Sequence, residues 1–331
     1  MKALFKGVAA AAVAFLALAV QAQAPSLKQV RVANGTTPDI LSIPDVRAFE
    51  HFLEKESGIP GKATYVPGAV RAIQAIIADE AEVGIATLSP GLAAVAQGQD
   101  IAVFSLASGA RPYLVPVTTT DIKKLKDLEG QNVGVISLVD STYYLLVMMM
   151  RGEGADPTKV NWRVVGGGAG RANALVAGGI KAAMFQVGQA LDLAKSGTHH
   201  VLPASNEGLK NVIFKAFWAK RSFLKSHPEV ANAIVRAHLL ATREALDKDK
   251  FMAYAPAMLA PATAESISRA YDVILRMGPW EPNDALLNPQ SGEHTINEMV
   301  RYKVLTAPVA FDKWATTVHV KAAVEKLGTA K

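Results

Sequence analysis

Hydroxyl and amide side chains occupy matching places in two segments of this chain. The segment of residues 74–98, QAIIADEAEVGIATLSPGLAAVAQG, aligns without a gap with residues 173–197, NALVAGGIKAAMFQVGQALDLAKSG. Thr87 and Gln186 fall at the same point, where a short apolar run ends in each copy. Such side chains both donate and accept hydrogen bonds, which suits them to a small polar ligand. The predicted contacts are Thr87, Leu88 and Ser89 in one copy and Gln186, Val187 and Gly188 in the other.

Two arginines, Arg71 and Arg171, take nearly equivalent places in the same repeat, each near the start of a predicted helix. A guanidinium group can bind a carboxylate or a sulfonate through two parallel hydrogen bonds. Each arginine is therefore a candidate anion clamp, and the alternative for each is a surface position without a ligand.

Polar loops follow the first predicted strand of each half. Gly35, Thr36 and Thr37 offer hydroxyls and backbone amides to a ligand oxygen, or serve only as a turn and a helix cap. Asp39 in the same loop can instead engage an amine. The matching loop opens a helix with N-cap residues that are also possible donors toward an anion: Ser137, Asp140, Ser141 and Thr142. The charge of Asp140 disfavours an anion bound directly beside it.

Three further residues are predicted to line the ligand site. Gly167 lies in GGGAG, which precedes a helix but lacks the GxGxxG spacing of a dinucleotide site, and we interpret this segment as a loop of close approach. Ser108 lies in ASGARP, where the strand and helix pattern of the first half ends. Trp218, near the predicted hinge, is a candidate aromatic wall.

The composition excludes several classes of protein. The chain has no cysteine, and its seven histidines are scattered without metal-ligand spacing. No GxSxG, HExxH or P-loop motif is present. The net charge of +6 is modest and no long basic run occurs, so nucleic acid is not an expected partner. We therefore expect no metal, no cofactor and no enzyme site of a familiar pattern.

The first 22 residues have the pattern of an export signal. Lys2 and Lys6 precede an apolar run from Val8 to Val20, and small residues follow in VQAQA. The run is shorter than the roughly 20 residues that span a bilayer, which disfavours an uncleaved anchor. We expect cleavage after Ala22 and a periplasmic location.

The elements that must position these residues are short strands separated by helices. Each half is predicted as β-α-β-α-β. Strands joined by helices pair in parallel through right-handed crossovers, so the predicted class is α/β, with an open, mainly parallel sheet flanked by helices in each of two lobes. Such sheets bind ligands beyond the carboxyl ends of their strands, where the polar loops lie.

Two lobes are also expected from length, since 331 residues exceed what a single core usually supports. We predict that the chain crosses between the lobes at PYLVPVTTT (residues 112–120) and again at NVIFKAFWAK (residues 211–220), and that these segments form a hinge. Residues 25–108 and 218–331 then form the first lobe, buttressed by the C-terminal helices, and residues 109–217 form the second.

Several motifs resemble those of a known family. KDLEGQNVGV, RGEGADPTKVNWRVVGG, RANALVAGGIKAAMF and FLKSHPEVANAIVRAHLLATREAL are similar to segments of the periplasmic solute-binding proteins of ABC importers, of the nitrate, sulfonate, taurine and thiamine-pyrimidine-precursor type (SsuA/THI5-like, NMT1-like). The resemblance covers nearly the whole chain after the export signal. Its most specific part is the ordered series DLEG, N-A-L-x-A-G and H-P-E-V.

The resemblance implies a type II binding-protein fold, whose two lobes close on a ligand in a central cleft, and an ABC permease in the inner membrane as partner. We expect a monomer that binds a small organic solute. The basic net charge and the two arginines favour a sulfonate or carboxylate, while Asp39 and the hydroxyl-rich loops allow an amine-bearing or pyrimidine ligand. The alternatives are a secreted enzyme like the thiamine-pyrimidine synthase, whose cysteine cluster this chain lacks, and a binding module for a membrane sensor.

Overall fold

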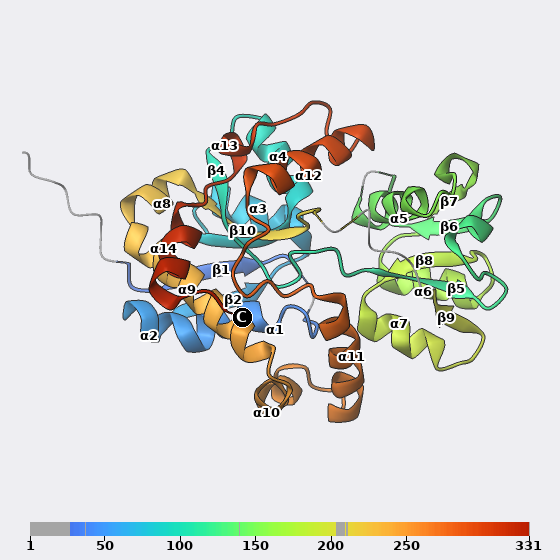
Figure 1. The fold of residues 1–331 in the computed structure, drawn as a ribbon, viewed down its shortest axis with the longest axis horizontal. Helices are drawn as coiled ribbons and strands as arrows, with labels where there is room; N and C mark the ends of the chain where they lie inside the picture. The colour runs from blue at the N-terminus through green and yellow to red at the C-terminus, as the bar shows by residue number, and fades with distance from the viewer. Residues whose placement is uncertain (1–26, 37, 139, 203–208, 210, 331) are drawn as a thin grey trace, which may run out of the picture.

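The structure, a computed structural model, describes residues 27–36, 38–138, 140–202, 209 and 211–330. Two lobes lie side by side, each built on one five-stranded sheet (Figure 1). The predicted export signal and the candidate Thr37 lie outside the described residues. Within these ranges, no helix is both long and apolar enough to cross a membrane.

The first sheet has the strand order β2-β1-β3-β10-β4. Its strands are β1 (Val30–Asn34), β2 (Gly61–Tyr65), β3 (Val83–Thr87), β4 (Ile101–Leu106) and β10 (Lys215–Lys220). β1 pairs in parallel with β2 and β3, whereas β10 runs antiparallel to β3 and β4. Four strands therefore share one direction, and the fifth is added after the chain has passed through the second lobe.

The second sheet repeats this arrangement in the order β7-β6-β8-β5-β9. Its strands are β5 (Val115–Thr119), β6 (Asn132–Val135), β7 (Asn161–Val164), β8 (Ala182–Phe185) and β9 (His199–Val201). β6 pairs in parallel with β7 and β8, and β5 runs antiparallel to β8 and β9. The prediction of two mainly parallel sheets is confirmed. The one antiparallel strand of each sheet is the strand that enters from the other lobe.

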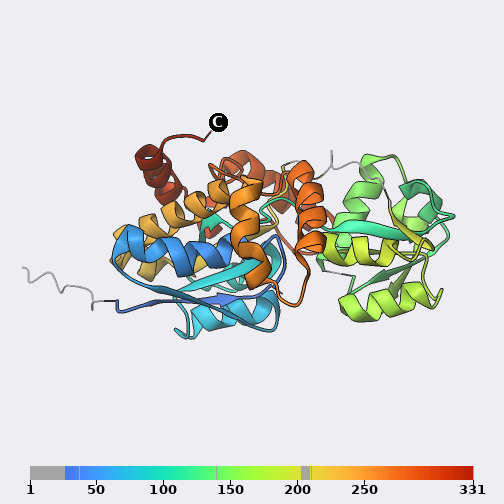
Figure 2. The same ribbon diagram turned by 90° about the horizontal axis from the view of Figure 1, so that it is seen from below.

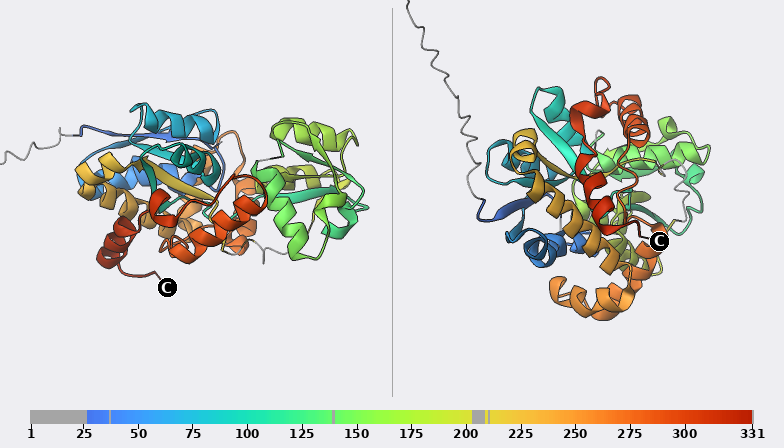
Figure 3. Two further views of the ribbon diagram at one scale, coloured as in Figure 1. Left: turned by 90° about the horizontal axis from the view of Figure 1, so that it is seen from above. Right: turned by 60° about the vertical axis from the view of Figure 1, so that its left-hand side comes forward.

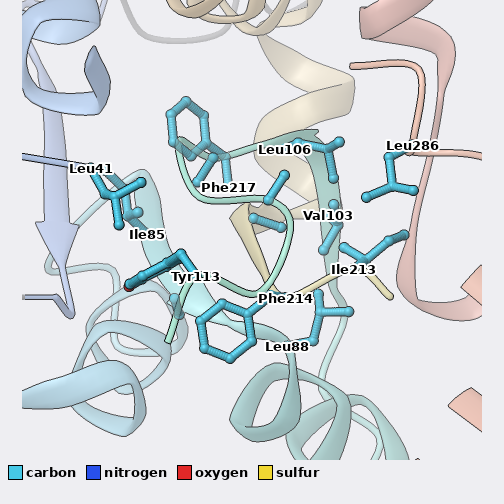
Figure 4. Close-up of a cluster of buried hydrophobic side chains, with 14 of the residues drawn as sticks. Leu41, Ile85, Leu88, Val103, Leu106, Tyr113, Ile213, Phe214, Phe217 and Leu286 are labelled. Carbon is cyan, nitrogen blue, oxygen red and sulfur yellow. The ribbon is translucent and has the colours of Figure 1, made fainter. Parts of the chain in front are cut away.

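The chain crosses between the lobes from β4 to β5 and again ahead of β10 (Figure 1). The crossing segments are bonded to each other, because the Phe214 N–H donates to the Ala110 carbonyl over 2.7 Å. The rings of Tyr113 and Phe214 pack edge to face with centroids 5.4 Å apart, in the buried cluster of Figure 4. The predicted lobe boundary between residues 217 and 218 falls inside β10, which belongs to the first sheet from Lys215 onward.

Helices between the strands cover the sheets. In the first lobe these are α1 (Ile43–Arg47), the π-helical turn η1 (Ala48–Phe52), α2 (Leu53–Ser57), α3 (Gly68–Ile77) and α4 (Leu88–Ala96). In the second lobe they are the 3-10 turn η2 (Leu125–Leu128), α5 (Ser141–Gly152), the 3-10 turn η3 (Pro157–Lys159), α6 (Gly168–Val176) and α7 (Val187–Ala194). Close packing explains why residue 91 of α4 is a glycine, since a Cβ at Gly91 would lie 2.4 Å from the Trp218 ring.

The C-terminal helices gather mainly on the first lobe, as Figures 2 and 3 show. They are α8 (Arg221–Ser226), α9 (Pro228–Ala245), α10 (Lys248–Met258), α11 (Ala264–Met277), α12 (Pro289–Arg301), α13 (Phe311–Trp314) and α14 (Val318–Leu327). α9 packs against α1, η1, α2 and α14. α11 also contacts α7, so the C-terminal segment touches the second lobe as well as buttressing the first.

Four buried ionisable groups lie together in the first lobe: Asp45 of α1, Lys215 of β10, His238 of α9 and Asp284 of the loop before α12. Lys215 Nζ lies 3.0 Å from Asp45 Oδ2 as an ion pair without hydrogen-bond alignment. His238 Nε2 lies 3.4 Å from Asp45 Oδ1, and His238 Nδ1 lies 3.9 Å from Asp284 Oδ1. We call this group the buried charge cluster.

The buried charge cluster holds the backbone at both ends of the crossing. The Ser108 N–H donates to Asp45 Oδ1 over 2.6 Å. The Ser105 hydroxyl and the Leu106 N–H donate to Asp284 Oδ2 over 2.6 and 3.0 Å. Lys215, a member of this cluster, is also the first residue of β10. The cluster therefore connects the end of β4 to the start of β10.

Burial and neighbouring charges shift the two carboxyl groups in opposite directions. Burial alone would raise the pKa of Asp45, but Lys215 and His238 outweigh it and hold this pKa below its ordinary value. Burial of Asp284 outweighs the opposing effects of His238 and of the donors Ser105 and Leu106, and raises its pKa to about 6.

Candidate functional site

A cavity of about 840 Å³ lies between the lobes, and we call it the main cleft. Its first-lobe wall consists of Gly35, Thr36, Pro67, Gly68, Ala69, Val70, Thr87, Ser89 and Pro90. Its second-lobe wall consists of Ile136, Asp140, Ser141, Thr142, Gly168, Ala169, Arg171, Gln186 and Gln189. The crossing segments add Tyr113, Leu114 and Phe214. The volume is typical of a site for a small molecule.

Five helices direct their N-termini at the main cleft. The lining residues of α3, α4, α5, α6 and α7 all lie at the N-cap or in the first turn. None of these five helices has a side-chain hydrogen bond at its N-cap. The first N–H groups of a helix have no acceptor within the helix, and they carry partial positive charge. The walls of the main cleft therefore favour an anionic group.

Thr87 and Gln186 hold equivalent positions in the two walls. Thr87 is the N-cap of α4, with φ −63° and ψ 157°, and Gln186 is the N-cap of α7, with φ −64° and ψ 148°. The gap-free alignment of the two segments is thus matched by the backbone, and both residues line the main cleft from opposite lobes.

Arg171 brings a positive charge into the wall of the main cleft. The side chain is only 5% exposed, and it donates to the carbonyls of Gly166, over 2.9 Å, and Met184, over 3.3 Å. Its guanidinium carbon lies 5.5 Å from the centre of the Phe185 ring. Among the described residues, no carboxylate forms an ion pair with it. Burial lowers the pKa of Arg171, and nearby Asp140 opposes this only in part, so an anion bound here would stabilise the charge.

Arg71 is the structural counterpart of Arg171, since each is the fourth residue of its helix. Arg71 nevertheless lies outside the main cleft, because its guanidinium pairs with Glu80 along a separate surface cavity of the first lobe. Asp79 and Glu80 follow α3, whereas Gly178 and Gly179 follow α6. Among the described residues, only Arg71 of the two arginines has an acidic ion-pair partner, so it is not placed to clamp a ligand in the cleft.

Asp140 adds a negative charge to the second-lobe wall. Its Oδ1 accepts the hydroxyl proton of Thr142 over 2.7 Å, and the Thr142 hydroxyl accepts the Ile136 N–H over 3.1 Å. These bonds fasten the start of α5 to the end of β6. The main cleft therefore presents both a cation, Arg171, and an anion, Asp140, from the same lobe.

Four of the other predicted residues are not in the lining. Leu88 and Trp218 are fully buried, and the Trp218 ring packs on Gly91, so it forms no wall of the main cleft. Ser108 is also buried and belongs to the contacts of the buried charge cluster. Gly167 is the N-cap of α6, directly before a lining residue.

The remaining predicted residues lie near the main cleft without lining it. Asp39, Val187 and Gly188 line a second, smaller cavity between α7 and α11. Ser137 lies in the loop between β6 and α5, whose later residues, from Asp140, do line the main cleft.

Sequence reasoning missed the aromatic part of the lining, which comes from Tyr113 and Phe214. The two residues are far apart in the chain and meet only because both crossing segments pass the same point. Both lie in segments already predicted to cross between the lobes, and that is the signal that would have found them. Burial, with Asp39 and Asp45 nearby, raises the pKa of Tyr113, so its phenol stays neutral.

The family model NMT1/THI5 like matches residues 49–250. No curated protein sequence matches the chain significantly.

Several solved structures have a similar fold. The alkanesulfonate-binding protein SsuA from Xanthomonas axonopodis pv. citri bound to MOPS has 14% identity and a TM-score of 0.68, over 88% of this chain and 100% of that one. The periplasmic nitrate-binding protein NrtA from Synechocystis PCC 6803 has 12% identity and a TM-score of 0.73, over 93% and 91%. A mutant of DSZB in complex with biphenyl-2-sulfinic acid has 14% identity and a TM-score of 0.64, over 90% and 99%.

Proposed function

Because the chain belongs to the NMT1/THI5-like family, we propose that it is the periplasmic binding protein of an ABC importer, which captures a small organic anion and delivers it to a membrane permease. Similar structures include an alkanesulfonate-binding and a nitrate-binding protein, which supports this role. Two lobes joined by two crossing segments suit a cleft that closes, since a ligand touching both walls favours the closed state.

The main support for an anionic ligand is the side chain of Arg171. This buried guanidinium, without a carboxylate partner among the described residues, lines the same cleft as the N-termini of five helices that have no side-chain hydrogen bond at the N-cap. An anion supplies the missing charge and accepts hydrogen bonds from both sources. A sulfonate or carboxylate head at the Arg171 wall would supply the negative charge that this guanidinium lacks among the described residues.

The rest of the main cleft favours an organic body on that anion. Tyr113, Leu114, Ile136 and Phe214 contribute apolar surface, and the volume of about 840 Å³ far exceeds the needs of a small inorganic ion. MOPS and biphenyl-2-sulfinic acid, the compounds in two of the similar structures, both join a bulky body to a sulfur oxyanion group.

The test is ligand-dependent thermal unfolding and calorimetry with hexanesulfonate, hexanoate, benzoate, nitrate and hexylamine. A ligand at 100 times its Kd stabilises the folded state by about 2.7 kcal/mol, which is a clear shift. We expect the organic anions to bind and Arg171→Gln to weaken them roughly tenfold to a hundredfold, because it removes charge-assisted hydrogen bonds.

The matched control is Arg71→Gln, the same change at the equivalent position of the other lobe. It is expected to leave affinity unchanged, because Arg71 pairs with Glu80 outside the main cleft. If Arg171→Gln and the unmodified protein bound every anion with equal affinity, the proposed binding of the anionic head at Arg171 would be ruled out. Binding of hexylamine that is lost in Asp140→Asn would show that the ligand is a cation.

A further inference from the structure

A second cavity of about 240 Å³ opens beside the main cleft, and we call it the side chamber. Its walls are residues 38–41 from the first lobe, α7 from the second lobe, and residues in the range 259–270 that reach into the first turns of α11. Gln186 and Gln189 line both cavities. The two spaces therefore meet at the first turn of α7.

The side chain of Gln189 stands at the boundary between the two cavities. Its Nε2 donates to the Gly168 carbonyl over 3.3 Å, and a Cβ at Gly168 would lie 3.1 Å from its Oε1. Gly168 is part of the main cleft, so this amide crosses from the α7 side to the α6 side. A hydrogen bond of this length is weak, and the amide can turn aside at little cost.

The inner wall of the side chamber is mostly apolar but includes the carboxyl group of Asp39, whose pKa burial raises, and its rim is polar. Leu41, Val187 and Ile267 are 1%, 1% and 3% exposed, and Leu191 and Leu259 are half-buried against the same core. The exposed rim carries charged side chains: Asp192, Lys195 and Arg269. This interior suits hydrocarbon, since burying a charged group there would cost its hydration.

We infer that the side chamber receives the apolar tail of the ligand whose charged head binds in the main cleft, so that the protein selects elongated amphiphilic anions over short ones. The inference rests on the proposed function. The shared glutamines make the tail of a cleft ligand the natural occupant, because any chain that passes Gln189 enters the side chamber. An occupied chamber also joins the lobes, since α11 and α7 form facing walls.

The experiment measures the affinities of straight-chain alkanesulfonates from two to ten carbons by calorimetry on the mature protein. In the unmodified protein, each added methylene that becomes buried is expected to raise affinity about fourfold, which corresponds to about 0.8 kcal/mol. The rise should continue to the longest chains, because the side chamber extends the space available beyond the main cleft.

Ala262→Trp narrows the side chamber, because Ala262 is an exposed residue of its wall. We expect this variant to bind the shortest sulfonates normally and to lose at least tenfold in affinity for the longest. Ala264→Trp is the matched control, another exposed alanine two residues away that does not line the chamber. Leu191→Gln makes the α7 wall polar and should repeat the loss, whereas Leu193→Gln, outside the chamber, should not.

The outcomes separate the inference from the function on which it rests. Affinity that stops rising at short chains, or long-chain binding equal in Ala262→Trp, Leu191→Gln and their controls, overturns the side chamber and leaves the proposed function in place. Absence of binding by every sulfonate and by the matching carboxylates overturns both. Length dependence lost only in the two chamber variants supports the inference.

Discussion

Arg71 and Arg171 show how far a single residue depends on its surroundings. They have the same place in equivalent units, yet one pairs with an acid at the surface and the other lies buried beside the main cleft. The difference comes from the turns after the two helices, which hold Asp79 and Glu80 in one lobe and two glycines in the other. One positive charge is thereby withdrawn from the cleft and one is kept.

Asp284 allows a prediction about pH. Its folded pKa of about 6 lies above its ordinary value of 3.8, so the folded state holds the proton more tightly than the unfolded state. The resulting stabilisation is complete below about pH 4 and is lost as pH rises through 6. Asp284→Asn removes this titration, and its φ of 50° suits asparagine. We therefore expect the free energy of unfolding of the variant, relative to the unmodified protein, to rise by about 3 kcal/mol between pH 4 and pH 7.

Urea unfolding at a series of pH values measures this difference. Asp127→Asn serves as a comparison, because that carboxylate accepts the N–H groups of Lys123 and Lys124 in a turn at the surface. A difference between Asp284→Asn and the unmodified protein that does not change with pH would contradict the assignment.

The sequence supports some ligand residues better than others. Thr87 and Gln186 could be predicted because a strand end followed by a helix start recurs at fixed spacing. The final positions of the Arg71 and Trp218 side chains could not be predicted, because each contacts a residue outside its own helix or strand, Glu80 or Gly91. Periodic pattern reveals which element a residue belongs to, while its final direction depends on packing.

At the scale of elements, the buried charge cluster joins both ends of the crossing to the helices of the first lobe. Lys215→Met leaves the Asp45 carboxylate buried without its cation, and we expect a loss of about 3–5 kcal/mol in the free energy of unfolding. The double variant Asp45→Asn with Lys215→Met should lose less than the sum of the single variants, because no unpaired charge remains. Urea unfolding of the four proteins measures the coupling.

An exposed ion pair provides the control for that cycle. Lys195 pairs with Asp192 on α7 with both side chains more than half exposed, and Lys195→Met should change stability by less than about 1 kcal/mol. Strict additivity of the Asp45 and Lys215 substitutions would mean that the two side chains contribute independently.

Most elements were predictable because strands and helices alternate with distinct periods. The direction of β5 and β10 was not, since each enters its sheet from the other lobe and pairs with strands far away in sequence. The local sequence pattern does not indicate which distant strands pair. The place of α11 against α7 was missed for the same reason, because an amphipathic pattern does not indicate which lobe a helix packs against.

At the scale of the whole molecule, the two lobes share a topology but differ in how the chain supplies it. The second sheet draws all its strands from one continuous stretch, from β5 to β9. The first sheet joins β4 to β3 only through β10, which follows the entire second lobe. The first lobe thus contains a gap that only a distant segment fills.

This strand order sets an order of folding. The second lobe can assemble as soon as its own residues are available, whereas β4 must wait for β10, and non-local pairing is slow. In pulse-labelled hydrogen exchange during refolding, we expect the amides of β6 and β8 to gain protection before those of β4. Simultaneous protection of all three would contradict this order. The lobe that begins the chain is then the last to be completed, and until that moment the edge of β3 is exposed to any other strand that can pair with it.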